Sequence, residues 1–149
     1  MECSPIGVVR SPVTEAVDKG WGRIVARVEL EPEYAAGLQG LAEFSHVLIL
    51  FLMHEATFDA SRHLRRRPRD LADMPEIGIF AQRARHRPNP IGVTAVELLN
   101  IEDNVIEVRG LDAVDGTPVL DMKPYMAIYD RIEAPQEPEW VARLMAEYF

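Results

Sequence analysis

The sequence predicts a mainly β protein, a single small domain built as a barrel or a sandwich with a few short helices. The 149 residues are the size of one domain, and their 48% hydrophobic and 27% charged side chains are typical of a globular chain. Short runs of alternating or continuous apolar residues recur at even spacing, as strands of a barrel or sandwich do. No strand–helix–strand alternation is visible, which argues against a parallel sheet covered by helices.

Three strands are expected in the first part of the chain. Residues 6–10 form a short first strand, and residues 13–22 follow as a loop. In residues 24–30 the even positions are apolar and alternate with the others, which indicates a half-buried strand. A proline flanked by glutamates favours a helix start at residues 31–33, and the following glycines keep that helix short. Residues 44–53 are a continuous apolar strand that carries a histidine.

The later elements are interrupted by one long excursion. Residues 55–75 make up this excursion, in which we expect residues 62–69 to be a mobile loop with one helical turn, and residues 77–81 resume as a strand. Residues 91–99 and 105–111 predict a hairpin. Residues 119–130 continue as an extended segment, and the proline inside it predicts an edge strand or a bulge.

The chain is expected to finish in a helix. Pro135 and Pro138 make a break, and an apolar stripe at helical spacing follows them. Its members are Trp140, Val141, Leu144, Met145 and Phe149. We therefore divide the single domain into residues 1–134, the β domain, and residues 135–149, a C-terminal helix that belongs to it.

Charge is unevenly distributed along the chain. The net charge is −8, which argues against a broad nucleic-acid surface. Residues 62–87, however, hold eight arginines and three acids, so this stretch carries +5. Such a basic stripe suits a phosphate-bearing partner, and the alternative is a solvated loop whose arginines pair with the acidic body. No apolar run is long enough to cross a membrane, no signal peptide is visible, and the single Cys3 fits a reducing cytoplasm.

The first chemical motif is Arg-Pro-Asn-Pro-Ile-Gly at residues 87–92. Two prolines around Asn89 make the backbone stiff and extended, so the amide is held on a fixed frame. Arg83 and Arg87 are planar donors suited to a carboxylate or a phosphate. Gly92 permits close approach of a ligand or of neighbouring chain. The alternative is a structural loop in which the asparagine caps backbone groups.

The second motif spans residues 110–125. Asp115-Gly116 predicts a tight turn, after which Thr117-Pro118 restarts the extended chain. Asp112 and Asp115 bracket a loop whose free backbone amides are able to hold a ribose or an amino-acid head group. Two residues apart on one strand, Asp121 and Lys123 share a side, and a structural ion pair is favoured over a catalytic role.

Together with residues 6–12 and 37–46, these blocks resemble the TsaA-like (TrmO-type) tRNA methyltransferase family from residue 6 to about residue 130. The resemblance implies a small β-barrel that forms a homodimer and binds S-adenosyl-L-methionine near the dimer interface. It implies methylation of the exocyclic amine of threonylcarbamoyl-adenosine beside the tRNA anticodon. The G-x-G-x-x-G nucleotide fingerprint is absent, so the resemblance alone points to this cofactor.

Site residues are carried over from the resemblance position by position. The implied cofactor contacts are His54, Glu55, Arg83, Arg87, Pro88, Asn89, Pro90, Val93, Asp112, Asp115, Gly116 and Thr117. Residues 19–21 are a weaker candidate, and the alternative for His54 is a strand-end histidine that faces solvent. The arginines predicted to contact tRNA are Arg62, Arg65, Arg66, Arg67 and Arg69. Gln82, Ala84 and Arg85 replace the threonine, serine and proline of many family members, which makes the loop more basic.

No catalytic residue is assigned. Methyl transfer from a sulfonium mainly needs alignment, although a proton acceptor assists an amine nucleophile, and Asp112, Asp115 and His86 are candidates. Two alternatives stay open, a methyltransferase acting on a small molecule and a non-enzymatic S-adenosylmethionine-binding module. A metal protein is disfavoured, because no compact ligand spacing is present. The histidines concerned are His46, His54, His63 and His86.

Overall fold

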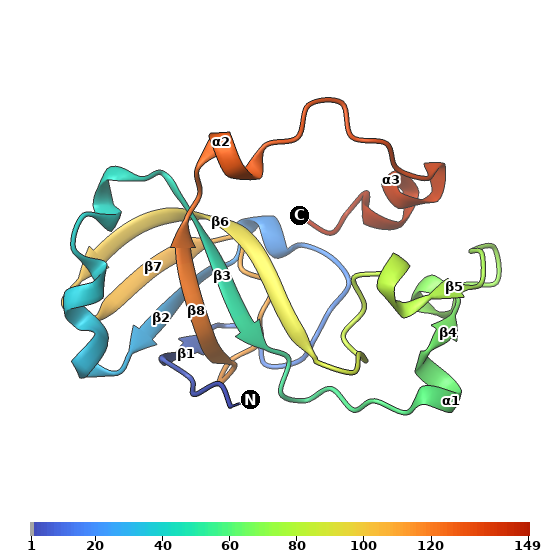
Figure 1. Ribbon diagram of the computed structural model, residues 1–149, viewed down its shortest axis with the longest axis horizontal. Coiled ribbons are helices and arrows are strands. Elements are labelled where there is room, and N and C mark those ends of the chain that lie inside the picture. Colours follow the sequence, from blue (N-terminus) through green and yellow to red (C-terminus); the bar gives the residue numbers. More distant parts are fainter. Residues whose placement is uncertain (1) are drawn as a thin grey trace.

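The computed structural model describes residues 2–149. Within them, six antiparallel strands close into a barrel in the order β1-β2-β7-β6-β3-β8 (Figure 1). The strands are β1 Gly7–Arg10, β2 Val25–Leu30, β3 His46–Leu52, β6 Ile91–Glu102, β7 Val105–Arg109 and β8 Pro118–Pro124. The ladder that closes the barrel joins β1 to β8, where Gly7 pairs with Val119. The mainly β prediction is confirmed, and the barrel replaces the sandwich alternative.

Alternate residues of each strand fill the interior of the barrel. Val28, Ile49 and Ile106 are fully buried, and each such side chain contributes about 1.5–3 kcal/mol relative to exposure. Gly92 faces the same interior, where an ideal Cβ would lie 2.3 Å from the ring of Phe51. The close approach that Gly92 permits is thus to a core aromatic ring. A filled barrel leaves its outer surface and its ends for binding.

β6 divides its length between two partners. It pairs with β3 from Ile91 to Glu97 and with β7 from Glu97 to Glu102. The first half of β6 therefore has a strand neighbour on one side only, and its other edge offers backbone groups to whatever lies beside it. β8 is bulged, but at the register shift opposite Leu50 and Phe51 and not at Pro124, from which the bulge was predicted and which ends the strand. It is not an edge strand, because β1 and β3 both pair with it.

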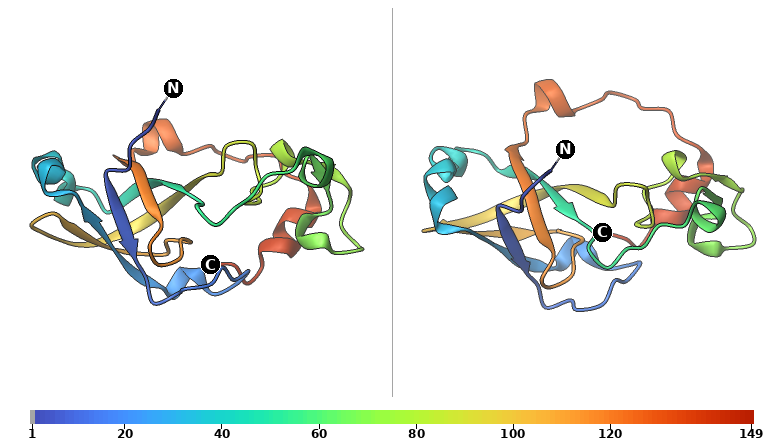
Figure 2. Two further views of the ribbon diagram at one scale, coloured as in Figure 1. Left: turned by 90° about the horizontal axis from the view of Figure 1, so that it is seen from below. Right: turned by 60° about the horizontal axis from the view of Figure 1, so that its bottom comes forward.

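The excursion between β3 and β6 forms a small lobe beside the barrel (Figure 2). It contains α1 Ala60–His63, β4 Arg65–Arg66, β5 Ile77–Gly78 and 3₁₀ helices at Pro68–Asp70 and Ile79–Ala81. The buried Gln82 amide donates to the carbonyls of Arg66 and Ile77, at 3.0 and 3.1 Å. The predicted strand over residues 77–81 is wrong beyond its first two residues, because β4 offers only two residues to pair with.

After β8 the chain crosses to the lobe and then returns to the barrel side at its C-terminus. The extended segment predicted to reach residue 130 ends at Pro124, and α2 Ala127–Asp130 follows, with the Asp130 carboxylate accepting from the N–H of Met126. The C-terminal helix is α3 Glu139–Met145, beside the lobe (Figures 1 and 2). Phe149, placed on the helix stripe by the sequence, lies beyond it.

Short 3₁₀ helices occupy three further connections. They are Trp21–Arg23, Pro32–Leu38 and Leu41–Glu43. The second is the short helix predicted after residue 31, and the first falls inside the predicted loop. In the described part of the chain, no helix combines the length and apolar character needed to cross a membrane.

Candidate functional site

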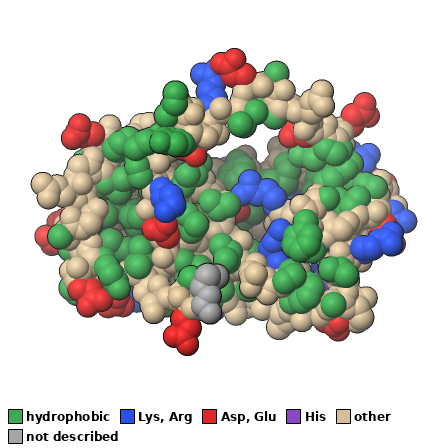
Figure 3. All heavy atoms as spheres, in the orientation of Figure 1, with side chains coloured by type: hydrophobic (Ala, Val, Ile, Leu, Met, Phe, Trp, Pro, Cys, Tyr) green, Lys and Arg blue, Asp and Glu red, His purple; other side chains and the backbone are tan. Residues whose placement is uncertain are grey.

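The free edge of β6 is where the lobe reaches the barrel. The Arg83 guanidinium donates to the backbone carbonyl of Val93 at 2.5 Å. That carbonyl lies in the half of β6 that β7 does not pair with. Arg83 and Val93, both predicted as site residues, are therefore brought together, and both side chains are exposed. The surface between barrel and lobe is hollowed, and basic side chains lie beside the hollow (Figure 3).

Asp112 lies next to this edge with both carboxylate oxygens engaged. The Thr94 hydroxyl, 7% exposed, donates to Oδ1, and the Tyr148 hydroxyl donates to Oδ2 at 2.7 Å. The flanking Leu111 and Ala113 are buried, so the Asp112 backbone is anchored in the barrel. Two donors, one from β6 and one from the C-terminal tail, thus fix the orientation of one predicted site carboxylate.

Tyr148 reaches this position because the C-terminal tail docks on the first 3₁₀ helix. The N–H groups of Gly20 and Trp21 donate to the carbonyls of Glu147 and Tyr148, both at 2.8 Å. Gly22 leaves room for the tail, since an ideal Cβ there would lie 2.6 Å from the carbonyl carbon of Phe149. Residues 19–21, predicted as a weaker cofactor candidate, thus include the two residues that bind the C-terminal tail.

Arg69 of the lobe completes the arrangement. Its guanidinium lies 5.9 Å from the centre of the Tyr148 ring and 3.5 Å from the Asp18 carboxylate. We call the residues joined by these contacts the β6-edge cluster. They are Asp18, Arg69, Arg83, Val93, Thr94, Asp112 and Tyr148.

The tyrosine of this cluster has a strongly altered acidity. Burial raises the pKa of Tyr148 far above its ordinary value, and the neighbouring Asp112 carboxylate raises it further. The phenol therefore stays protonated throughout the working pH range and acts as a donor toward Asp112.

The Arg-Pro-Asn-Pro segment is braced from within. Arg87 donates to the carbonyls of Gln82 and Ala84, at 2.7 and 3.3 Å, so its guanidinium stiffens the loop. The carbonyl of Pro90 accepts from the N–H of Met53 at 2.8 Å, which ties the segment to the end of β3. Pro88 and Asn89 are exposed. The segment continues directly into Ile91, the first residue of β6.

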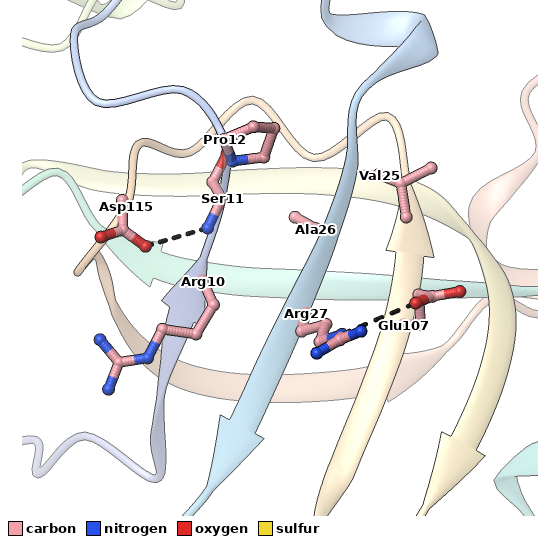
Figure 4. Close-up of a pocket in the computed structure, with 8 residues that line it drawn as sticks. All are labelled: Arg10, Ser11, Pro12, Val25, Ala26, Arg27, Glu107 and Asp115. Carbon is pink, nitrogen blue, oxygen red and sulfur yellow. Dashed lines mark hydrogen bonds and ion pairs between the residues drawn. The ribbon is translucent and has the colours of Figure 1, made fainter.

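The Asp115 turn lies apart from the cluster. The Asp115 carboxylate accepts from the N–H of Ser11 at 3.0 Å, and the N–H of Gly116 donates to the carbonyl of Val9 at 2.8 Å. Thr117 is 2% exposed and pairs with the same strand. Asp115 borders a shallow hollow of about 400 Å³ on the outside of β1 and β2, where Arg27 pairs with Glu107 (Figure 4). No cluster residue lines this hollow.

The histidines are scattered. His54 and its neighbour Glu55 are exposed just after β3. His86, a candidate proton acceptor, stacks on His63 in the lobe at 4.7 Å between ring centres, and its Nδ1 lies 2.7 Å from the carbonyl oxygen of Thr57. Of the three candidate acceptors, Asp112 belongs to the β6-edge cluster. Within residues 2–149 no three His, Cys, Asp or Glu side chains gather as a metal site would require.

Several of the arginines predicted to meet tRNA have partners within the protein. Arg65 pairs with Glu76 at 3.2 Å and Arg66 with Asp70 at 2.5 Å. Arg67 donates to the carbonyl of Met74, and Arg69 belongs to the cluster. Arg62, Arg65 and Arg67 remain exposed, so the basic stripe is partly neutralised but still reaches solvent.

Three cluster residues, Asp18, Thr94 and Tyr148, were missed in the sequence. Thr94 had a usable signal, because it is a polar residue at an inward position of an alternating strand and a buried hydroxyl needs a partner. Tyr148 had none, because its role depends on how the tail returns to the barrel. The Asp121–Lys123 ion pair predicted from strand alternation is present and is structural.

Comparison with known proteins identifies relatives of this chain. The model of the tRNA-methyltransferase O N-terminal domain family matches residues 17–131. A probable S-adenosyl-L-methionine-binding protein of Archaeoglobus fulgidus is 40% identical over 131 residues, which cover 85% of this chain and 34% of that protein. Another, from Methanothermobacter thermautotrophicus, is 39% identical, with 86% of this chain and 92% of that protein covered.

Proteins named as tRNA-modifying enzymes are also similar. The human tRNA (adenine(37)-N6)-methyltransferase is 38% identical over 132 residues, 89% of this chain and 29% of the human protein. The crystal structure of TrmO from Pseudomonas aeruginosa superposes with a TM-score of 0.76 at 33% identity, and covers 94% of this chain and 61% of that one. The chain thus spans about a third of some relatives and less than two thirds of the solved enzyme.

Proposed function

The chain belongs to the tRNA-methyltransferase O N-terminal domain family, and from that premise we propose that it transfers a methyl group from S-adenosyl-L-methionine to tRNA. The observation that carries this proposal is the β6-edge cluster. Two of its members, Arg83 and Asp112, come from the two sequence motifs that carry the family resemblance. Arg83 binds the carbonyl of Val93 and Asp112 binds the hydroxyl of the next residue, Thr94, so both reach the half of β6 that β7 leaves unpaired.

The cofactor's polar groups fit the donors and acceptors at this edge. Arg83 is exposed and offers a planar fork for a carboxylate. Asp112 is half-buried, and its carboxylate suits ribose hydroxyls or a cationic group. The exposed Asn89 adds an amide on the rigid proline frame. We also propose contacts from Val93 beside Arg83, and from His54 and Glu55 after β3.

The remaining motif residues act on the site indirectly. Arg87 stiffens the loop that ends in Pro88 and Pro90, through its bonds to Gln82 and Ala84. Asp115, Gly116 and Thr117 tie the loop that begins at Asp112 to β1. Bound S-adenosylmethionine would supply a methyl group already activated on a sulfonium. What the protein contributes is alignment of donor and acceptor, which needs these rigid supports.

The substrate we propose is the exocyclic N6 amine of threonylcarbamoyl-adenosine next to the anticodon. The human relative is named for N6 methylation of adenine 37 in tRNA. Arg62, Arg65 and Arg67 present exposed positive charge on the lobe, which suits contact with the phosphate backbone. This role fits a cytoplasmic protein.

A homodimer is the assembly we propose. On the outer face of β3 and β6, three apolar pairs stand side by side, Leu52 with Ile91, Leu50 with Val93 and Leu48 with Ala95. Ile91 and Val93 are 48% and 43% exposed. Hydrophobic side chains are abundant on this face of the barrel (Figure 3). A second copy of the chain would bury this strip, which includes Val93 and is therefore close to the proposed cofactor site.

A specific observation supports a second candidate, a binding module without turnover. The Methanothermobacter relative matches this chain over 92% of its own length and is named as a binding protein. The relative named as a tRNA methyltransferase is much longer, with 29% covered. A small-molecule methyltransferase is the third candidate, supported by the internal pairing of Arg65, Arg66 and Arg69.

Binding and transfer measured separately distinguish these candidates. Calorimetric titration with S-adenosylmethionine should show binding, and Arg83→Ala should weaken it about tenfold, as expected for a lost charged hydrogen bond. Arg131→Ala, in an exposed connection, is the matched control. Labelled methyl groups should then enter tRNA rather than a small-metabolite extract. Binding without incorporation into either favours the binding module, and no binding at millimolar cofactor contradicts the proposal.

A further inference from the structure

We infer that Tyr148 is a positioning residue of the proposed cofactor site, whose hydroxyl holds the Asp112 carboxylate in its binding orientation. The inference rests on the proposed function. It adds a residue that lies outside the family-matched range 17–131. The hydroxyl of Tyr148 donates to Asp112 Oδ2 at 2.7 Å.

The position of Tyr148 is specified by the surrounding chain. Two backbone hydrogen bonds, from Gly20 to Glu147 and from Trp21 to Tyr148, fix the tail on the first 3₁₀ helix. Gly22 leaves space that a side chain would fill. Further back, Arg143 of α3 pairs with Asp73 of the lobe at 3.4 Å. The tail that carries the phenol is therefore attached to the first 3₁₀ helix and, through α3, to the lobe.

The other carboxylate oxygen shows what Tyr148 adds. The buried Thr94 donates to Asp112 Oδ1, but this one hydrogen bond restrains rotation of the carboxylate about its Cβ–Cγ bond less than two donors do. The hydrogen bond to Oδ2 restrains this rotation further, because the two oxygens are then held from different elements. Each oxygen retains acceptor capacity for a ligand, since a carboxylate oxygen accepts more than one hydrogen bond.

Arg69 supports the ring and has no contact with the carboxylate. Its guanidinium lies 5.9 Å from the ring centre and is itself held by Asp18. The ring is therefore packed independently of its hydroxyl, and removing the hydroxyl alone should leave the tail in place. This separation makes Tyr148→Phe a sharp test, and exposed Tyr129→Phe in α2 its matched control.

The test is a double-mutant cycle read by calorimetric titration with S-adenosylmethionine. Tyr148→Phe and Asp112→Asn should each raise the dissociation constant about tenfold, and the double variant should bind no worse than Asp112→Asn. In turnover, the KM for the cofactor should rise more than kcat falls. Tyr129→Phe should match the wild type. Melting temperatures of all variants, measured in parallel, report any loss of folding.

The outcomes separate the inference from the function on which it rests. If the wild type binds and Tyr148→Phe binds equally well, the positioning role is refuted while the proposed function stands. If the two substitutions weaken binding additively, Tyr148 does not act through Asp112 and the inference also fails. A wild type that binds no cofactor overturns the proposed function, and with it the role of Tyr148 at that site.

Discussion

The guanidinium of Arg69 lies over the ring of Tyr148, 5.9 Å from its centre, although the two residues belong to the lobe and the C-terminal tail. Arg69 was predicted from the sequence to contact tRNA. In the structure it joins the lobe to the tail and to Asp18, and its side chain is 27% exposed. An arginine from a basic stripe thus serves as an internal contact.

Arg69→Ala should lower the stability of the protein. Loss of the contact with the Tyr148 ring is worth about 1 kcal/mol, which corresponds to about 2–4 °C in melting temperature for a chain of this size. Exposed Arg62→Ala is the matched control and should melt like the wild type. Equal melting temperatures for the two variants would show that the Arg69 contact contributes no stability.

Gly22→Ala should displace the C-terminal tail, because the new methyl group would lie 2.6 Å from the backbone of Phe149. The amides of Gly20 and Trp21 would then lose their partners and exchange hydrogen faster. Gly37→Ala, where nothing lies within 4 Å of the new methyl group, provides the control. Hydrogen exchange followed by mass spectrometry measures both, and unchanged exchange over residues 20–21 would contradict the docking described above.

Alkaline titration should reveal Tyr148 as the last of the four tyrosines of the chain to ionise. The pKa of Tyr148 is raised in the folded state by burial and by Asp112, so its contribution to stability is full below about pH 10, the ordinary value, and is lost as the pH rises further. Phenolate absorbance should show a last step that Tyr148→Phe lacks. The free energy of unfolding of the variant should fall less steeply above pH 10. A variant whose titration matched the wild type would exclude a buried, protonated Tyr148.

Charge reversal at Arg62 and Arg65 should weaken tRNA binding and reduce its dependence on salt. If both arginines meet phosphates, the slope of log affinity against log salt should fall by about 1–2. Arg131→Glu changes an exposed arginine outside the lobe and serves as the control. Filter binding across a salt series measures the slopes, and parallel slopes for all three proteins would remove the lobe from the tRNA contact.

Ala95→Arg should convert the proposed dimer to a monomer. Ala95 is exposed at one end of the apolar strip of β3 and β6, so a long cation there tests the interface with little risk to the core. Ile128→Glu is the control, since Ile128 is 90% exposed on α2 and does not belong to the strip. Analytical ultracentrifugation reports the mass. A monomeric wild type, or an Ala95→Arg variant that stays dimeric, rules out this interface.

The barrel strands were predictable because period-two alternation directly records which side chains face a core. Residues 24–30 and the hairpin around Asp103 follow that pattern and are strands in the structure. The lobe was not predictable in the same way. Residues 77–81 are apolar, but only two of them find a strand partner, and Phe80 is 79% exposed. Propensity alone does not make a strand where no neighbour is available.

The candidate site was half predictable for a related reason. Arg83, Val93 and Asp112 came from the motifs, and the structure places them at or beside the edge that β7 leaves unpaired. Asp115 shares a motif with Asp112, but its carboxylate binds Ser11 on another face. Asp112 and Asp115 are close in sequence but separate at a turn, whereas Trp21 and Tyr148 are joined by a backbone hydrogen bond across most of the chain. Sequence order does not contain that information.

The ladder between β1 and β8 affects how the chain reaches its fold. Gly7 finds Val119 only after more than a hundred residues have been synthesised, whereas β2, the other neighbour of β1, is available early. Closing so long a loop costs entropy before the contact stabilises anything, so barrel closure should be a late and comparatively slow folding step. Until the barrel closes, the apolar residues of β3 and β6 stay exposed to solvent. A nascent chain in this state is a substrate for a chaperone.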